Sequence, residues 1–469
     1  MKKLRWTMDD GFGDLDMSTS ITIDGIARPV PGDSLPLGLS RGTKLSRPKQ
    51  IDFMQRFMSA FFLPSYADHP ARVGDGLALQ RVLTFPFGEN WIATFLGQFN
   101  LQKLASSLKD KGSREPPESS WLKNLGKHLC DKSMYAFGFC SEFLITPNDT
   151  LLVSSEACGD KKRYRKKAVL DHKFPQHNLT VEATSPGLFV DKVGTYWDVP
   201  LLITADLASV PSDSGFNDHF CIHYISGAAK QFNSDQTGPI PPSLLPGLYV
   251  KSAFSIKKNV DIWRRKSGKL KMVQPFDIFL SDPHISASAT VGTVATASFR
   301  DNSVRLKRED ELQGYGRFDV NFPGKKCAFL ADLFASVSCT AQHGNFQRLF
   351  LDLSQLHARL DFPSGSKFLS GAARLVQDLN NSQPPDLAAL HAICPNVTLS
   401  LQQQIVGPFS FRIDSRVSFD FNSRGWHTHV DESMFAIEYA LQVLGSAKAI
   451  AWYSTKHREA MVELRFFET

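Results

Sequence analysis

The longest regular pattern in the chain is an alternation of apolar and polar residues in the segment FSFRIDSRVSFDF. One set of alternate positions is mostly apolar: Phe409, Phe411, Ile413, Ser415, Val417, Phe419 and Phe421. The intervening set is polar throughout: Ser410, Arg412, Asp414, Arg416, Ser418 and Asp420. Successive side chains of a β-strand point to opposite faces. The segment therefore predicts a long strand with one apolar and one polar face.

Two further alternating runs follow before the chain ends. The first carries Phe435, Ile437, Tyr439, Leu441 and Val443 on one face, and the closing run carries Val462, Leu464 and Phe466. Turn-like segments at 422–433 and 454–459 separate these runs. Less regular strand patterns occur earlier, at 91–101, 135–145, 250–262, 318–322, 333–341 and 356–362. The order of runs and turns predicts an antiparallel meander.

Strand length favours a membrane β-barrel over a soluble sheet, although alternation alone fits both. Soluble strands usually have about five or six residues, whereas tilted membrane strands need about 9–11, and several runs reach the longer value. No uninterrupted apolar stretch reaches the roughly 18 residues of a transmembrane helix. We therefore expect a mainly β fold: an antiparallel membrane β-barrel with a few short helices. The C-terminal strand would close this barrel and leave no open edge.

Helical spacing is confined to a few segments. The segments 49–62 and 119–133 combine apolar helix faces with basic flanks, which is typical of helices that lie on a membrane surface. The segment 366–393 predicts two short helices separated by Pro384 and Pro385. We accordingly divide the chain into an N-terminal basic segment (1–75), with an amphipathic helix and room for a barrel strand, and a barrel (76–469) with a helical insertion near 364–395.

Composition and charge restrict the function classes only mildly. The chain has 469 residues, of which 42% are hydrophobic, and 53 Lys and Arg against 47 Asp and Glu give a net charge of +6. This excess is too small to indicate nucleic acid without a recognition motif. The 7 cysteines are odd in number and lack CxxC spacing, which favours reduced thiols in a non-oxidising compartment. The first residues lack the apolar region of a signal peptide.

We could not assemble a set of catalytic acid, base and nucleophile from the sequence, and three polar clusters are candidates for metal or catalytic sites. His219, Cys221 and His223 have strand spacing. His427, His429 and Asp431 fall in a predicted turn, and His357 and Asp361 fall on one strand face. Each cluster lacks a further ligand or catalytic partner, so we interpret all three as polar structural residues. We assign no catalytic residue, no metal and no cofactor.

Basic clusters point to anionic headgroups instead. One cluster, at 161–167, is predicted to form a loop. The candidate lipid-binding residues are those on the N-terminal basic segment and on the second amphipathic segment: Arg41, Lys44, Arg47, Lys49, Arg56, Lys123, Lys127 and Lys132. Each Lys or Arg near an anionic membrane surface contributes about 1 kcal/mol of attraction. The alternative is that these residues only orient the protein at the surface.

Long stretches along the whole chain also resemble a plant family. They are DLDMSTSITIDGIARPVPGDSLPLGLSRGTKLSRPKQ, GKHLCDKSMYAFGFCSEFLITPNDTLL, PGLFVDKVGTYWDVPL, SLLPGLYVKSA, HARLDFPSG, SLQQQIVGPFSF, FAIEYALQVL and MVELRFFET. The family is that of the trigalactosyldiacylglycerol lipid-transfer proteins of the chloroplast outer envelope, in the branch of the fourth-named member.

This resemblance implies a non-enzymatic homodimeric barrel that binds phosphatidic acid. The barrel would move lipid derived from the endoplasmic reticulum across the plastid outer envelope for galactolipid synthesis. Its implied partners are phosphatidic acid and other glycerolipids, an inner-envelope ABC-type lipid importer complex and endoplasmic reticulum contact sites. Outer-envelope barrels also generally lack a cleaved presequence. The alternatives are a soluble β-rich lipid-binding protein and a lipid-modifying enzyme.

Overall fold

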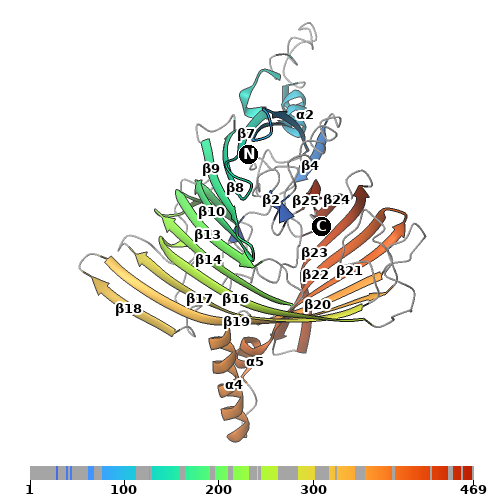
Figure 1. Cartoon of the computed structure of the whole chain (residues 1–469). Coiled ribbons are helices and arrows are strands. Elements are labelled where there is room, and N and C mark those ends of the chain that lie inside the picture. The colour runs from blue at the N-terminus through green and yellow to red at the C-terminus, as the bar shows by residue number, and fades with distance from the viewer. Residues whose placement is uncertain are drawn as a thin grey trace.

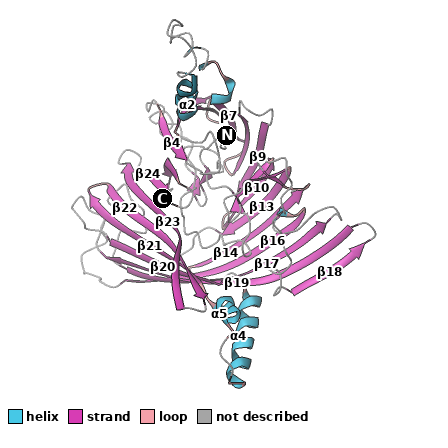
Figure 2. Ribbon diagram, turned by 180° about the vertical axis from the view of Figure 1, so that it is seen from behind, coloured by secondary structure: helices cyan, strands magenta, loops and turns pink. Residues whose placement is uncertain are grey.

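The structure is a computed structural model, in which strands dominate the described part of the chain. It describes residues 28–29, 39–40, 43–44, 62–67, 77–111, 126, 129–158, 164–190, 196–209, 215–231, 240, 244–261, 284–300, 316–322, 325–343, 354–362, 364–382, 386–422, 425–441, 447–455 and 458–466. The prediction of a mainly β fold with few helices is confirmed (Figures 1 and 2).

One large antiparallel sheet contains most of these strands. Its N-terminal half consists of β4 (Leu63–Ala67), β5 (Ala78–Pro86), β6 (Trp91–Asn100), β7 (Tyr135–Leu144), β8 (Asp149–Cys158), β9 (Tyr164–Lys173), β10 (His177–Ser185), β13 (Leu201–Ser209) and β14 (Phe216–Ser226). The second half consists of β16 (Gly247–Asp261), β17 (His284–Arg300), β18 (Gly316–Phe322), β19 (Lys325–His343), β20 (Ser354–Phe362), β21 (Asn396–Val406), β22 (Phe409–Asn422), β23 (Gly425–Leu441), β24 (Ala447–Ser454) and β25 (Glu459–Phe466).

Hydrogen-bonded pairing between these strands forms a closed ring. Most neighbours in the ring are also neighbours in the sequence, as in the predicted meander. The C-terminal strand β25 pairs with β4, and β4 pairs with β5, through three residue pairs each, such as Glu459 with Ala67 and Ser65 with Ala78. We call this region the seam. β25 therefore joins the two ends of the sheet, as expected, through a short contact.

The two faces of β22 follow the sequence pattern. Ser410, Arg412 and Asp414 are buried, whereas Phe409 on the other face is 42% exposed. A register shift between Arg416 and Val417 then interrupts the pairing of β22 with β23. The same arrangement, with polar side chains buried and apolar side chains exposed, recurs on β7, where Phe137 is 60% exposed and Glu142 is buried. The ring of strands, which we call the wall, thus has an apolar outer face and a polar inner face.

Antiparallel register places every described helix at one end of the ring, which we call the helical rim. β6 ends and β7 begins at this rim, and between them lie α2 (Leu101–Lys111) and the short 3-10 helix η1 (Lys132–Met134). β20 ends and β21 begins at the same rim, and between them lie α4 (Gly365–Asn380) and α5 (Leu387–Ile393). At the opposite rim the described connections at 87–90, 145–148, 174–176 and 407–408 are short turns.

A small second sheet also lies at the helical rim. It consists of β1 (Arg28–Pro29), β11 (Gly187–Val190), β12 (Tyr196–Val199) and β15 (Lys230–Gln231). Residues of this sheet, of the adjoining barrel strands and of the connecting segments between β14 and β16 form a buried apolar cluster: Phe189, Trp197, Val199, Leu202, Ile225, Ala229, Ile240 and Leu244. A separate two-residue pair of strands, β2 (Leu39–Ser40) and β3 (Thr43–Lys44), completes the described strands.

The helices differ in part from expectation. α4 and α5 lie on either side of Pro384 and Pro385, as the sequence predicts. α2 was not predicted, although Leu101, Leu104 and Leu108 have helical spacing. Of the predicted helices, 49–62 lies outside the described residues except for Phe62, and 119–133 is described only at 126 and 129–133. None of the helices formed by the described residues has the length and hydropathy to cross a bilayer.

Two segments predicted as irregular are strands. The segment 422–433 was expected to be a turn, but β23 begins at Gly425, and Trp426, Thr428 and Val430 pair with the apolar positions of β22. The basic cluster at 161–167 was expected to be a loop, but β9 begins at Tyr164. Its Arg165 and Lys167 lie on the inner face, where carboxylates of neighbouring strands pair with them.

Gly292 in β17 permits an unusually close approach on the inner face. A Cβ atom at this position would overlap the ring of Phe334 in β19 and the carbonyl oxygen of Ser252 in β16. Phe334 is buried, and the Lys251 ammonium lies 5.8 Å from the centre of its ring. The missing side chain at 292 therefore makes room for an aromatic ring on the wall.

We predict that Gly292→Ala destabilises the sheet, because overpacking costs about 1–3 kcal/mol. Gly97→Ala in β6 is the matched control, since a Cβ atom there would meet no other atom within 4 Å. Thermal unfolding of the purified protein in detergent, followed by circular dichroism, should show a lower midpoint for Gly292→Ala only. Phe334→Leu should restore part of the loss. Equal midpoints for the two glycine variants would contradict this account.

Candidate functional site

The outer face of the wall exposes aromatic side chains along β5, β6 and β7. Phe95 and Phe139 lie 5.0 Å apart between ring centres near the middle of the strands. Trp91 stacks between Phe87 and Phe143 at the end of the strands opposite the helical rim, with ring centres 4.4 and 5.6 Å away. Its indole Nε1 donates a hydrogen bond to Ser141 Oγ at 2.8 Å. Exposed aromatic rings on a barrel wall, with a polar contact near the rim, are typical of a lipid-facing surface.

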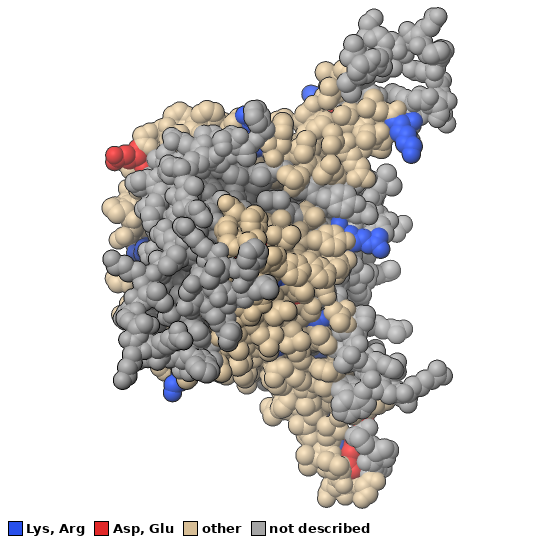
Figure 3. All heavy atoms as spheres, turned by 90° about the vertical axis from the view of Figure 1, so that its right-hand side faces the viewer, with Lys and Arg blue, Asp and Glu red and all other residues tan. Residues whose placement is uncertain are grey.

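Aliphatic side chains continue this apolar surface on the remaining strands. Val291 of β17, Leu333 of β19 and Leu356 of β20 are each about half exposed (58%, 51% and 50%). Among the described residues on the face seen in Figure 3, charged side chains lie mainly near the margins. Apolar surface of this extent is uncommon on a monomeric soluble protein.

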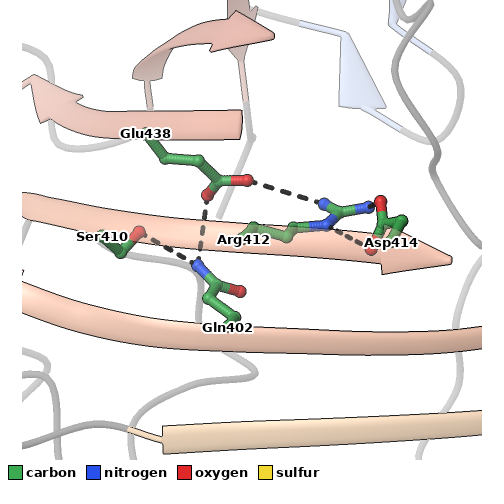
Figure 4. A network of polar contacts seen from close by, with 5 residues as sticks. All are labelled: Gln402, Ser410, Arg412, Asp414 and Glu438. Atoms are coloured by element: carbon green, nitrogen blue, oxygen red, sulfur yellow. Dashed lines mark hydrogen bonds and ion pairs between the residues drawn. The ribbon is translucent and has the colours of Figure 1, made fainter. Parts of the chain in front are cut away.

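The inner face of β21–β23 carries a buried network of charged and polar groups. The Arg412 guanidinium donates to both carboxylate oxygens of Asp414, from Nε at 3.0 Å and from Nη2 at 2.7 Å (Figure 4). Its Nη1 lies 3.5 Å from Glu438 Oε1 on the neighbouring strand. Gln402 Nε2 donates to Glu438 Oε2 and to Ser410 Oγ, each at 3.2 Å. Three adjacent strands are therefore tied together on their inner faces.

A second network lies on the inner face of β8–β10. Lys167 Nζ is 3.0 Å from Glu182 Oε1, and Arg165 Nη1 is 3.9 Å from Glu156 Oε2. Thr184 Oγ1 donates to the same Glu182 oxygen at 2.7 Å. The buried Lys167 and the partly buried Arg165 each have a carboxylate partner, which offsets the cost of removing the charge from water. The sequence signal for the first network is the polar half of the alternation along β22, whereas the second network lies partly in a segment that was predicted to be a loop.

The histidine clusters occupy ordinary polar positions on the wall. His219 pairs with Asp206, and His223 contacts Thr204 Oγ1 at 3.1 Å and Cys221 Sγ at 2.9 Å. Thr340 Oγ1 lies 2.6 Å from His357 Nδ1, and Asp361 accepts from Arg359 Nε at 2.7 Å. His427, His429 and Asp431 lie in β23, not in the predicted turn. Within the part of the chain that the structure describes, no group of His, Cys, Asp and Glu could hold a metal ion.

Only two of the eight candidate headgroup residues fall among the described residues. Lys132 is exposed and begins η1 at the helical rim. The adjacent Asp131 accepts a hydrogen bond from Ser133 N, and Lys103 of α2 donates to Ser133 O at 3.3 Å, so η1 lies against α2. Lys44 lies in β3. The remaining candidates lie outside the described residues: Arg41, Arg47, Lys49, Arg56, Lys123 and Lys127.

The whole chain can be aligned with a known protein. It is 52% identical over 479 aligned residues to "Protein TRIGALACTOSYLDIACYLGLYCEROL 4, chloroplastic" from Arabidopsis thaliana, and the alignment covers 100% of both chains. No protein-family model matches the chain. Identity of this degree along the full length, together with the resemblance of the quoted stretches, places the chain in one family. The chain belongs to the TRIGALACTOSYLDIACYLGLYCEROL 4 family.

Proposed function

We propose that the protein is a non-enzymatic lipid-transfer protein of the plastid that spans the outer envelope membrane as a β-barrel. The observation that carries this proposal is the inverted distribution of side chains. Large apolar residues such as Phe137 and Val291 are exposed on the outer face, while Arg412, Asp414 and Glu438 are buried on the inner face. Hydrocarbon can cover the first set, whereas the second set requires polar surroundings.

Two observations favour lipid transfer over a chemical reaction on the lipid: the name of the related protein, and the arrangement of the polar groups on the inner wall. The name of the relative in Arabidopsis thaliana denotes a galactolipid and a chloroplast. The polar groups of the inner wall that we have described are engaged with one another in networks of hydrogen bonds and ion pairs. This arrangement suits a polar path along which a headgroup moves more than it suits an acid–base pair poised on a substrate.

The finer parts of the proposal concern the lipid, its direction and the partners. We propose that the protein binds phosphatidic acid and moves lipid derived from the endoplasmic reticulum across the outer envelope for galactolipid synthesis. It would act as a homodimer at endoplasmic reticulum contact sites, and deliver lipid to an inner-envelope ABC-type importer. Phosphatidic acid is a phosphomonoester whose second ionisation is favoured by nearby cations, so clustered Lys and Arg prefer it to phosphatidylcholine.

The two faces of β13 provide a direct test of membrane insertion. The residue Ile203 on the outer face is 38% exposed, and the side chain of Asp206 on the inner face is 40% exposed, so in a soluble protein both positions would be accessible to water. We predict that a water-soluble thiol reagent labels Asp206→Cys but not Ile203→Cys in native membranes, because lipid covers the outer position. The variants are made in a chain whose native cysteines are replaced, and resistance to carbonate extraction verifies insertion.

Solubilising the membranes in a detergent of small micelle size serves as the control, since Ile203→Cys should then react more readily. Equal labelling of both positions in intact membranes would contradict the barrel assignment. Release of the protein by carbonate would instead favour a soluble β-rich lipid-binding protein.

The candidate headgroup residues are tested by charge removal in two groups. We predict that Lys123→Gln, Lys127→Gln and Lys132→Gln together weaken binding to liposomes that contain phosphatidic acid by about tenfold or more at low salt, because each cation contributes about 1 kcal/mol. The second group is Arg41, Lys44, Arg47, Lys49 and Arg56, each changed to Gln. Sedimentation with liposomes is measured against phosphatidic acid content and salt, since added salt screens the attraction.

The matched control changes two exposed lysines of the wall, Lys173→Gln and Lys258→Gln. It should leave the binding unchanged. If neither candidate group lowers binding at low salt, the headgroup site lies elsewhere. Incubation with labelled phosphatidic acid, followed by product analysis, tests the alternative of a lipid-modifying enzyme; chemical conversion of the lipid would overturn the proposed transfer function.

A further inference from the structure

The helical pair α4–α5 is fixed firmly to the wall at the helical rim. Asp332 of β19 is buried, and its carboxylate accepts hydrogen bonds from Ser364 Oγ at 2.5 Å and from Ser366 N at 3.0 Å. Ser364 Oγ also accepts from Lys367 N and so caps the start of α4. Phe368 of α4 packs edge-on against Phe362 at the end of β20, with ring centres 5.6 Å apart. The helix therefore leaves the wall in a defined direction.

That direction leads away from the ring. Figures 1 and 2 show α4 and α5 side by side outside the sheet, beyond β19, with α4 pointing away from the wall. α5 covers one side of α4, where Gly371 lets the backbones approach: a Cβ atom there would meet Ala389 O and Ala392 Cβ at 2.9 and 3.0 Å. The pair thus forms a compact unit that projects outward from the wall.

A second side of α4 is apolar but exposed. Leu369, Val376 and Leu379 are 66%, 66% and 72% exposed, and helical geometry of 3.6 residues per turn places them on one side of α4. Arg374 lies on the opposite side by the same geometry. Gly365, at the start of the helix, lies next to Leu333, which belongs to the apolar outer face of the wall. The apolar stripe of α4 is therefore continuous with the surface that the proposed function assigns to lipid.

We propose that the α4–α5 pair is a membrane-surface element, which inserts its stripe of Leu369, Val376 and Leu379 into the lipid leaflet around the helical rim. This inference rests on the proposed function, since it requires lipid around the wall. An amphipathic helix with one strongly apolar side and one charged side is the form that lies in a membrane interface. An outward-pointing helix at the rim has the orientation that such a position requires.

The size of the stripe favours lipid over a second copy of the chain. Three aliphatic side chains offer about 300 Å² of apolar surface, taking roughly 100 Å² for each. A stable interface between two proteins buries about 800 Å² on each partner. The stripe also lacks the Trp, Tyr and Arg anchors that dominate protein interfaces.

The test places the photoreactive residue p-benzoylphenylalanine at single positions of the full chain, reconstituted in phosphatidylcholine vesicles that carry a labelled lipid. The stripe positions are Leu369, Val376 and Leu379, and the matched control on the other side of α4 is Arg374. Phe137, which is 60% exposed on the outer wall, reports contact of the barrel itself with lipid. Cross-linked products are separated into lipid adducts and adducts between two copies of the chain.

We expect lipid adducts at Phe137 and at all three stripe positions, at a yield about fivefold or more above that at Arg374, because the stripe is immersed in the leaflet and Arg374 faces water. Lipid adducts at Phe137 without adducts at the stripe would overturn this inference and leave the barrel in place. Adducts between two copies at the stripe would assign it to a dimer interface, which also overturns the inference. An absence of lipid adducts at both Phe137 and the stripe would overturn the membrane barrel as well.

Discussion

Pairing of backbone N–H and C=O groups around a closed ring is the constraint on which the remaining features depend. A strand with an unpaired edge leaves its polar groups without partners, and in hydrocarbon each such group costs several kcal/mol. Most of the described strands pair with their neighbours in sequence, and β4 completes the ring through three residue pairs with β25 and three with β5. Where the backbone is paired within the sheet, the side chains decide which surroundings each face requires: apolar for the outer face and polar for the inner face.

The inner networks are a second consequence of that closure. A closed ring turns one face of every strand inward, and on β22 that face carries Arg412 and Asp414. A buried charge without a partner is strongly destabilising, by about 3–5 kcal/mol when one member of a pair is removed. Partners for Arg412 come from its own strand and from Glu438 on β23. The ion pairs therefore favour one register between β22 and β23, and they also give the inner face of the ring a polar lining.

The sequence predicts most of the wall, because alternation with period two directly reports a two-faced strand. β22 and β7 were predicted in this way. The pattern fails at Arg165 and Lys167, because a run of charged residues predicts a loop. Their carboxylate partners, Glu156 and Glu182, lie on other strands, so the sequence alone does not show the ion pairs. It also fails for strands as short as β11 and β12, which show no periodicity.

Contacts between distant residues could not be predicted from the sequence. Asp332 contacts Ser364 and Ser366, more than 30 positions away, and only the folded structure shows that these residues meet. Of the candidate headgroup residues, only Lys132 has a described exposure, and it was predicted because its segment combines cations with an apolar helix face.

The seam has a consequence for how the chain folds. Nearly every ladder of the ring joins strands that are close in sequence and can form soon after both have been synthesised. The pairing of Glu459 with Ala67 instead joins residues nearly 400 positions apart, so among the described pairings it has by far the longest loop to close. The entropic cost of loop closure grows only with the logarithm of loop length, but the contact cannot form before the last strand exists. We therefore expect strands that are close in sequence to pair first and β25 to pair with β4 last. That final pairing involves three residue pairs.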